Sequence, residues 1–241
     1  MTYLSVSKKL HQDLEGIINS KEPGAKLLSE PQLAQQLGVS RATLREAMRT
    51  FEIQGKIRRR QGSGTFVTHP SQVIESGLEV LESIQTLADR IGLKVKLGKW
   101  RTDIRLPHKS EYTTLQIHPN DYIMDVSRVI IAGDRPAAFL TDVLPLDVLR
   151  PEEVEKNFTG SILDLLLEKG TPKLMVARTD INAVTSSAQV ARALGIQRGD
   201  ALLYLSADLY TPDGRVVNIS HSYFLPGYFN FHVVRRIGQQ T

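Results

Sequence analysis

The stretch from Gly24 to Val67, GAKLLSEPQLAQQLGVSRATLREAMRTFEIQGKIRRRQGSGTFV, combines helix-start signals, a glycine turn and a basic helical face. Its first helix begins after Ser29, because Ser29 and Gln32 have the spacing of a capping box and Pro31 stands in the first turn, where no intrahelical bond is lost. Gly38 can adopt the left-handed conformation that closes a tight turn. We therefore expect a short helix that ends at Gly38.

A second helix, capped by Ser40, separates an apolar face from a basic one. Apolar residues recur at i, i+3, i+4 and i+7, and arginines recur at i, i+4 and i+8 on the other side. These residues are Leu44, Ala47, Met48 and Phe51 on the apolar face and Arg41, Arg45 and Arg49 on the basic face. Two short helices joined by a glycine turn predict a helix-turn-helix. The alternative interpretation is an ordinary solvated basic face.

The residues that follow favour DNA binding. Lys56 to Arg60 is β-branched and basic, Gln61 to Gly64 is a turn, and Thr65 to Val67 is a second short strand, which together predict a hairpin. A glycine tip allows the backbone to approach a groove or a phosphate closely, and the adjacent arginines supply charge that suits both guanine and phosphate.

Three motifs in this stretch resemble the winged-helix DNA-binding domain of the GntR family of bacterial transcription regulators. They are G-x-x-L-x-S-E, L-G-V-S-R-x-T-L-R-E-A and R-x-G-x-G-T-F-V. The resemblance implies that the second helix contacts DNA and that the glycine tip enters the minor groove. Pro31 stands where many members carry a phosphate-binding arginine, so one contact is missing. The predicted DNA-binding residues are Ser29, Glu30, Ser40, Arg41, Thr43, Arg45, Arg49, Arg58, Arg60, Gln61, Gly62, Ser63 and Gly64.

Composition concentrates positive charge in this first part. Residues 1–70 contain 11 lysines and arginines against 6 acidic residues, whereas the remainder contains 19 against 20. The basic excess therefore belongs to the predicted DNA-binding domain, as an electrostatic footprint requires.

Several classes of protein are disfavoured. The chain has no cysteine, which excludes disulfides, thiolate zinc sites and cysteine nucleophiles. Its six histidines lack metal-binding spacing, so we expect no metal and no cofactor. The sequence contains no apolar run long enough for a membrane span and no signal-peptide core, so we expect a cytoplasmic protein without membrane contact.

The predicted organisation is a DNA-binding domain at 1–70, a linker at 71–79 and a second domain at 80–241. The second domain contains an internal repeat: Tyr112 to Pro145 and Ser187 to Pro226 each predict a helix followed by a long hairpin. Two such units predict an α+β fold, with an antiparallel sheet that carries helices on one face. We expect a last strand, Tyr228 to Arg236, to close the sheet.

This layout resembles the UTRA domain, the effector-sensing half of the HutC subfamily of GntR regulators, which shares its fold with chorismate lyase. The resemblance depends on Arg128, the Ala132 to Pro136 turn, Pro145, Ser161, Ala193 to Ile196, the Asp213-Gly214 turn and Phe231. It implies an effector cleft beside the sheet. The residues predicted to bind the effector are Arg128, Ser161, His221 and Tyr223.

A serine at a helix N-terminus together with an arginine can clamp a carboxylate or phosphate, which predicts an anionic effector. The alternative interpretations are a simple N-cap for Ser161, an ion-paired strand residue for Arg128, and core packing for His221 and Tyr223. By this resemblance, family members that sense sugar phosphates tend to carry an arginine, two glutamates and a tyrosine at four positions of the cleft. This chain has Ile130, Leu140, Asn218 and Phe224 there, which favours a less polar anion.

The sequence thus predicts a ligand-responsive regulator, a repressor, that binds a palindromic operator as a homodimer and responds to a small anionic metabolite. The alternative is a lyase-like enzyme with an appended DNA-binding head. No acid/base pair with suitable spacing supports catalysis, so we predict no catalytic residues. A structural chromatin protein would show neither an effector response nor a sequence preference.

Overall fold

The computed structural model describes residues 3–53, 56–60, 62–67, 74–90 and 93–233. The chain divides into two units, Met1–Val73 with Pro226–Tyr228, and Ile74–Leu225 with Phe229–Thr241. We call the first unit the head and the second the sheet domain. A short strand, β3 (Ile74–Gly77), lies inside the segment 71–79 that the sequence predicts as a linker. The domain boundaries 1–70 and 80–241 stay a prediction.

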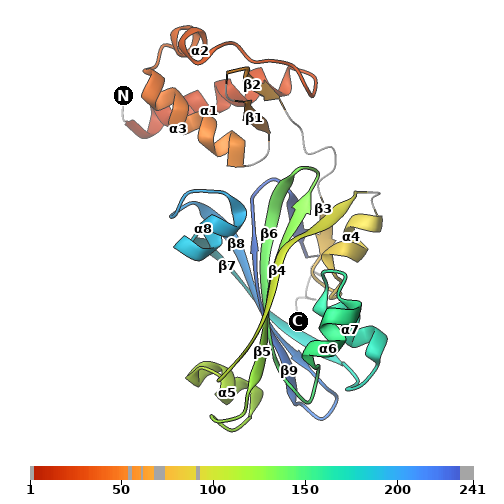
Figure 1. The fold of residues 1–241 in the computed structure, drawn as a ribbon. Helices are drawn as coiled ribbons and strands as arrows, with labels where there is room; N and C mark the ends of the chain where they lie inside the picture. The colour runs from red at the N-terminus through yellow and green to blue at the C-terminus, as the bar shows by residue number, and fades with distance from the viewer. Residues whose placement is uncertain (1–2, 54–55, 61, 68–73, 91–92, 234–241) are drawn as a thin grey trace, which may run out of the picture. The chain divides into compact units, whose positions relative to one another are not determined.

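The described part of the head contains three helices and a two-stranded hairpin, which include the helix-turn-helix and the hairpin that the sequence predicts (Figure 1). These are α1 (Tyr3–Asn19), α2 (Glu30–Leu37), α3 (Arg41–Ile53), β1 (Ile57–Arg60) and β2 (Gly64–Val67). Their apolar faces form one core, which includes Leu10, Leu14, Ile18, Leu33, Leu44, Met48, Phe51 and Ile57. The predicted apolar face of α3 is buried in full, so the helix presents its other side to solvent.

Local hydrogen bonds explain where the two central helices begin and end. The backbone N–H of Ser29 donates to Oε1 of Gln32 (3.2 Å), and the backbone N–H of Thr43 donates to Oγ of Ser40 (3.1 Å). Gly38 ends α2 with φ of 65°, in the left-handed region. Both helix starts and the glycine turn are confirmed.

The hairpin receives support from a segment that the sequence did not predict as a strand. The Leu27 N–H donates to the Thr65 carbonyl, and the Gly24 N–H donates to the Val67 carbonyl, both at 2.8 Å. Lys26 also forms a β-bridge with Phe66. The residues before α2 therefore run along β2 and tie the hairpin to the helices.

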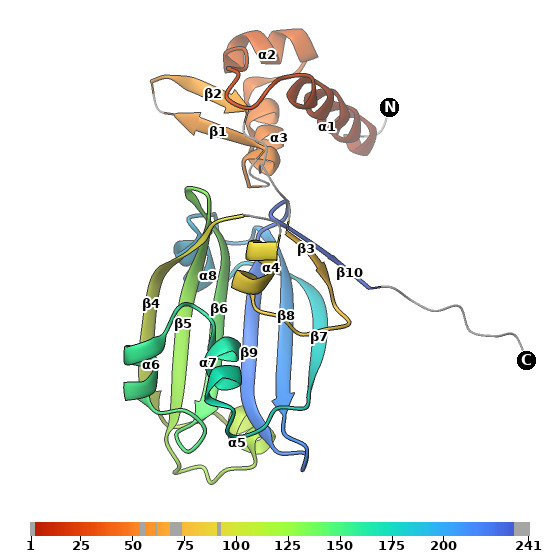
Figure 2. The ribbon, with the colours of Figure 1, turned by 90° about the vertical axis from the view of Figure 1, so that its right-hand side faces the viewer.

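The sheet domain is built on a six-stranded antiparallel sheet in the order β4-β5-β6-β9-β8-β7 (Figure 2). Its strands are β4 (Val95–Arg105), β5 (Ile123–Ala132), β6 (Arg135–Pro145), β7 (Val176–Thr185), β8 (Ala201–Tyr210) and β9 (Val216–Phe224). The internal repeat is confirmed, because α5 (Lys109–Leu115) precedes the β5-β6 hairpin and α8 (Ala188–Leu194) precedes the β8-β9 hairpin.

Helices cover both faces of the sheet, so the predicted one-sided cover is wrong (Figure 1). One face carries α4 (Ile84–Arg90), α6 (Pro151–Asn157) and α7 (Ile162–Lys169), and the other carries α5 and α8. Side chains alternate along a strand, and the central strands are apolar in both directions. Met124 and Leu144 pack toward α6 and α7, whereas Ile123 and Val143 pack with Leu115 of α5.

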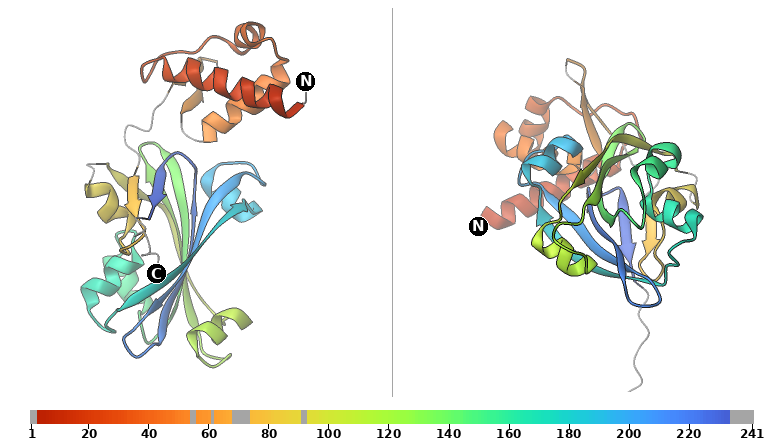
Figure 3. Two further views of the ribbon diagram at one scale, coloured as in Figure 1. Left: turned by 180° about the vertical axis from the view of Figure 1, so that it is seen from behind. Right: turned by 60° about the horizontal axis from the view of Figure 1, so that its bottom comes forward.

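The last described strand lies outside this sheet, which corrects a second expectation. β10 (Phe229–His232) pairs in parallel with β3, and the two strands lie side by side in Figure 3. A turn at Gly227 and Tyr228 separates β9 from β10, and the rings of Phe229 and Phe231 meet the ring of Phe224 edge-on, with centroid distances of 4.8 Å each. Because β9 already pairs with β6 and β8, it has no free edge for β10, and the aromatic cluster packs β10 against Phe224 instead. Residues 234–236 of the predicted strand lie outside the described part.

Candidate DNA-binding surface and effector cavity

The first turns of α3 present an exposed polar surface. Arg41, Thr43 and Arg45 are exposed, whereas Leu44 and Met48 on the same helix are buried. Ser40, which caps the helix, is exposed as well. The helix therefore offers guanidinium and hydroxyl groups on the side that faces away from the core, as a recognition helix does.

Glu30, at the start of α2, holds one of these arginines in place. Its Oε2 accepts a hydrogen bond from Nε of Arg45 at 2.7 Å, while 60% of the Arg45 side chain stays exposed. Arg59 of β1 approaches the same carboxylate at 3.7 Å and donates to the Arg45 carbonyl at 3.4 Å. Glu30 thus joins α2, α3 and the hairpin, and it orients the Arg45 guanidinium.

The hairpin places basic residues next to its glycine tip. Arg60 is exposed and lies over the Phe66 ring at 5.1 Å, and Nζ of Lys26 lies 6.0 Å from the same ring. Gly64 has φ of 114°, and a Cβ added there would come within 2.6 Å of the Lys26 side chain. Lys26 is not among the residues predicted from sequence, because it stands before the helix start with no periodic partner.

The thirteen predicted DNA-binding residues differ in exposure. Nine are exposed: Ser29, Ser40, Arg41, Thr43, Arg45, Arg60, Gly62, Ser63 and Gly64. Three are half-buried: Glu30, Arg49 and Arg58. Arg49 lies 3.7 Å from Glu46 of its own helix. Gln61 lies outside the described residues.

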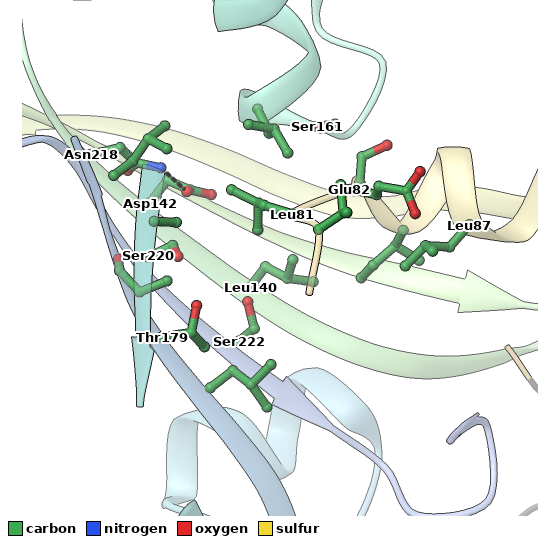
Figure 4. Close-up of a pocket in the computed structure, with 18 of the residues that line it drawn as sticks. Leu81, Glu82, Leu87, Leu140, Asp142, Ser161, Thr179, Asn218, Ser220 and Ser222 are labelled. Carbon is green, nitrogen blue, oxygen red and sulfur yellow. Dashed lines mark hydrogen bonds between the residues drawn. The ribbon is translucent and has the colours of Figure 1, made fainter. Parts of the chain in front are cut away.

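The sheet domain contains a cavity of about 630 Å³ on the face that carries α4, α6 and α7. Figure 4 shows Asp142, Asn218, Ser220 and Ser222 along its sheet side. Opposite them lie Ser161 at the start of α7 and residues such as Leu81 and Leu87 from the segment that contains α4. Arg128 and Ser161, two of the predicted effector-binding residues, line this cavity. The cavity is also lined by the four uncharged residues that the sequence analysis compares with sugar-phosphate sensors, namely Ile130, Leu140, Asn218 and Phe224.

Arg128 is buried and already paired. Its Nη1 donates to Oδ2 of Asp142, its Nε donates to the Gly160 carbonyl at 2.6 Å, and its guanidinium lies 5.8 Å from the Phe158 ring centroid. The Arg128 and Asp142 side chains are 6% and 5% exposed. The geometry of Arg128 therefore matches the alternative interpretation, in which this arginine is an ion-paired strand residue.

Ser161 acts as the N-cap of α7. Its Oγ accepts a hydrogen bond from the Asp164 N–H at 3.0 Å, and the residue is buried. The hydroxyl proton of Ser161 can still donate to a group in the cavity, because the cap uses only the oxygen.

His221 and Tyr223 lie on the opposite face of the sheet, so the prediction that they share a cleft with Arg128 is wrong. Along β9, Asn218, Ser220, Ser222 and Phe224 face the cavity, and the alternating residues face away. His221 and Tyr223 line a second groove of about 320 Å³ with Arg105, Glu111 and Asp125. Because side chains alternate between the two faces of a strand, the odd-numbered His221 and Tyr223 could have been separated from the even-numbered cavity residues of β9 on sequence alone.

The second groove contains strong polar pairs. Arg105 donates to both Glu111 oxygens at 2.7 Å and to Asp125 at 2.8 Å, and Tyr204 shares a 2.6 Å hydrogen bond with Nδ1 of His221. Burial would raise the pKa of Glu111, but hydrogen bonds from Arg105 and from the His108 N–H hold that pKa below its ordinary value. Burial raises the pKa of Tyr223. The groove is thus a network of mutually satisfied groups.

The described residues contain no group of three or more histidine or acidic side chains that could hold a metal ion. Within the same ranges, no helix has the length and apolar character needed to cross a membrane.

Comparison with known proteins identifies both parts of the chain. The family model "Bacterial regulatory proteins, gntR family" matches residues 2–67, and the model "UTRA domain" matches residues 101–230, more than half of the chain. The HTH-type transcriptional repressor NagR of Bacillus subtilis is 27% identical over 220 residues, which cover 90% of this chain and 88% of that protein. The histidine utilization repressor of Pseudomonas aeruginosa is 28% identical over 192 residues, which cover 65% and 72%.

A solved structure supports the fold. PhnF from Mycobacterium smegmatis matches with a TM-score of 0.62 and 19% identity, covering 95% of this chain and 100% of that one. The expected winged head and the antiparallel UTRA sheet are both confirmed. The chain therefore belongs to the GntR family of bacterial transcription regulators, in the HutC subfamily that joins a winged helix-turn-helix to a UTRA domain.

Proposed function

We propose that this protein is a repressor that binds a palindromic operator as a homodimer and is released or repositioned by a small effector in the sheet-domain cavity. The observation that carries the proposal is the exposed polar side of α3, with Arg41, Thr43 and Arg45 in solvent and the apolar side buried. A protein that binds operator DNA acts in the cytoplasm, as the sequence predicts. The relatives named above are regulators, which favours this function over the lyase-like alternative.

Within the head we assign different tasks to the predicted residues. Arg41, Thr43 and Arg45 read base edges, because they stand in the first turns of the recognition helix. Arg58, Arg60 and the tip at Gly62 to Gly64 contact the backbone and the minor groove, and Lys26 joins them. Glu30 orients Arg45 and does not touch DNA, since a carboxylate beside phosphates would be repelled.

The proposed homodimer matches the two-fold symmetry of the proposed palindromic operator. Two heads joined through their sheet domains read half-sites about one helical turn apart. The strand β7 is the last in the order of the six-stranded sheet, so one of its edges is unpaired among the described strands, which suits a contact between proteins. Size-exclusion chromatography with light scattering at micromolar concentration tests this part, and a monomer there would contradict it.

The effector and the operator are coupled. An effector that lowers operator affinity by some factor must itself bind more weakly, by the same factor, to the DNA-bound protein. The cavity has the volume expected of a small-molecule site. We therefore place the effector there.

The decisive experiment is a fluorescence-anisotropy titration with duplex DNA from the region upstream of the chain's own gene. We expect specific binding, and we expect Arg41→Ala and Arg45→Ala each to cost about 1 to 3 kcal/mol. Arg192→Ala, an exposed arginine on α8 of the sheet domain, is the matched control and should bind like the parent. A double Arg41→Ala, Arg45→Ala variant with parental affinity would refute the proposed recognition surface.

A further inference from the structure

The charges that line the effector cavity restrict what it can hold. The charged residues among its described lining are Glu79, Glu82, Arg128 and Asp142, which are three carboxylates and one guanidinium. An anionic group entering the cavity would have to pair with Arg128. That guanidinium is already compensated by Asp142.

Asp142 is not free to give way to an incoming anion. Its Oδ2 accepts from Arg128, and its Oδ1 accepts from Nδ2 of Asn218 at 2.7 Å. An anion placed beside this carboxylate would be repelled in a poorly solvated site, because the Arg128 and Asp142 side chains are almost completely buried. The cavity therefore disfavours a carboxylate or phosphate.

Two buried groups in the same lining lack hydrogen-bond partners among the described residues. Because Asn218 donates its amide to Asp142, the amide orientation is fixed and Oδ1 is the atom left over. Asn218 Oδ1 and Gln85 Nε2 are both buried without a partner, one an acceptor and one a donor. Both atoms have almost no accessible surface, so the polar groups that a ligand in the cavity can meet are the lining hydroxyls of Ser161, Ser220 and Ser222, each able to donate and accept a hydrogen bond.

The floor of the cavity explains its volume and its polarity. Asp142, Ser220, Ala207 and Thr179 stand opposite one another across β6, β9, β8 and β7. Their side chains are small, so space remains above the sheet. The next row, Leu140, Ser222, Leu205 and Ile181, is mostly aliphatic. The floor thus combines the neutral hydroxyls of Ser220 and Thr179, beside the paired Asp142, with a wide apolar surface.

We propose that the cavity takes an uncharged molecule with a mainly apolar body and a neutral group that both donates and accepts hydrogen bonds, such as a carboxamide. This inference rests on the proposed function, since it concerns the same cavity, and it replaces the anionic effector predicted from sequence. The matched probes are adamantane carboxamide, adamantane carboxylate and adamantane methylammonium. They share one rigid apolar body and differ in charge.

Isothermal titration of the full chain with the three probes tests the inference. We expect the carboxamide to bind at least about 10-fold more tightly than either charged probe, a difference of about 1.4 kcal/mol. Tighter or equal binding of the carboxylate would restore an anionic effector. Tighter or equal binding of the methylammonium would assign the site to cations, and no binding of the carboxamide would remove the proposal.

A charge-switching variant sharpens the test. Asp142→Asn keeps the shape of the side chain and releases the Arg128 charge, so we expect the carboxylate to gain at least about 10-fold in affinity. Asp125→Asn makes the same change beside Arg105 on the other face, and it should leave all three affinities unchanged.

An Asp142→Asn variant that folds and still excludes the carboxylate contradicts the inference. If that variant does not fold, the parental comparison decides. Operator binding by the probe-free protein is measured separately, so a failed probe test leaves the proposed regulator standing.

Discussion

The cavity of the sheet domain and helix α3 of the head use arginine in opposite ways. Arg45 of α3 pairs with Glu30 at 2.7 Å and keeps 60% of its side chain in solvent. Arg128 of β5 pairs with Asp142 and keeps only 6%. A guanidinium on the head can exchange its carboxylate partner for a phosphate or a guanine, whereas the buried one is committed to the fold. Exposure, more than residue type, therefore decides whether an arginine serves as a binding group or as a structural one.

Arg105 provides an intermediate case on the other face of the sheet. Its side chain is 25% exposed and bonds Glu111 and Asp125. The three pairs form a series in which the cost of breaking the pair should fall as exposure rises, from Arg128 through Arg105 to Arg45.

The largest effect is expected for Arg128→Met. The change leaves Asp142 buried without its cation, and it should lower the free energy of unfolding by about 3 to 5 kcal/mol. Urea unfolding followed by fluorescence measures this, because Trp100 of β4 is the single tryptophan. Arg178→Met, which removes an exposed arginine 3.5 Å from Asp180, is the control and should have little effect.

A loss of less than about 1 kcal/mol in Arg128→Met would break the comparison, since it would equate a buried pair with a surface pair. The double variant Arg128→Met, Asp142→Leu should recover most of the stability, because apolar replacements of similar size remove the unpaired charge.

A middle-sized effect is expected for Glu111→Gln. Replacing the carboxylate should cost about 1.5 to 3 kcal/mol at pH 7, because it weakens charged hydrogen bonds from Arg105. The folded-state pKa of Glu111 lies below its unfolded value, so its contribution is present above that unfolded value and is lost as pH falls through the folded pKa.

The parent should therefore lose stability below about pH 4.3, where an unfolded glutamate takes up a proton, and Glu111→Gln should show a shallower loss. Urea unfolding between pH 7 and pH 3 measures both curves. Glu168→Gln, on an exposed side chain of α7, should follow the parent. Parallel curves for Glu111→Gln and the parent would show that the Arg105 pair contributes nothing that depends on pH.

The smallest effect is expected for Glu30→Ala. Loss of an exposed pair should lower operator affinity by no more than about 1 kcal/mol, because Arg45 becomes less well oriented. The sign discriminates between two roles. Removing a negative charge near DNA would by itself strengthen binding, so an increase in affinity would show that Glu30 does not position Arg45. Glu155→Ala, exposed on α6, is the control.

Much of the head was predictable because its signals are local. Ser29, Gln32 and Gly38 set the limits of α2 through bonds that span a few residues, and the spacing from Leu44 to Phe51 fixes the buried side of α3. The hairpins of the sheet domain were also predictable, since each follows a short helix and turns at glycine. Local sequence was sufficient wherever the stabilising partner lies nearby in the chain.

The errors concern partners that lie far apart in sequence. Nothing near Arg128 indicates that Asp142 neutralises it, and nothing near Phe229 indicates that β10 pairs with β3. His221 and Tyr223 are a different kind of error. Their alternation with Ser220 and Ser222 was visible in the sequence and already required opposite faces.

Because β3 pairs in parallel with β10, the backbone hydrogen bonds of β3 depend on a strand that comes after the whole large sheet in the sequence. Ile74–Gly77 finds its four backbone neighbours in Phe229–His232, more than 150 positions later in the sequence. A premature stop codon or a proteolytic cut just after Pro226 would leave every strand of the large sheet in place but would remove β10, the pairing partner of β3. Shortened versions of the sheet domain should therefore extend through His232.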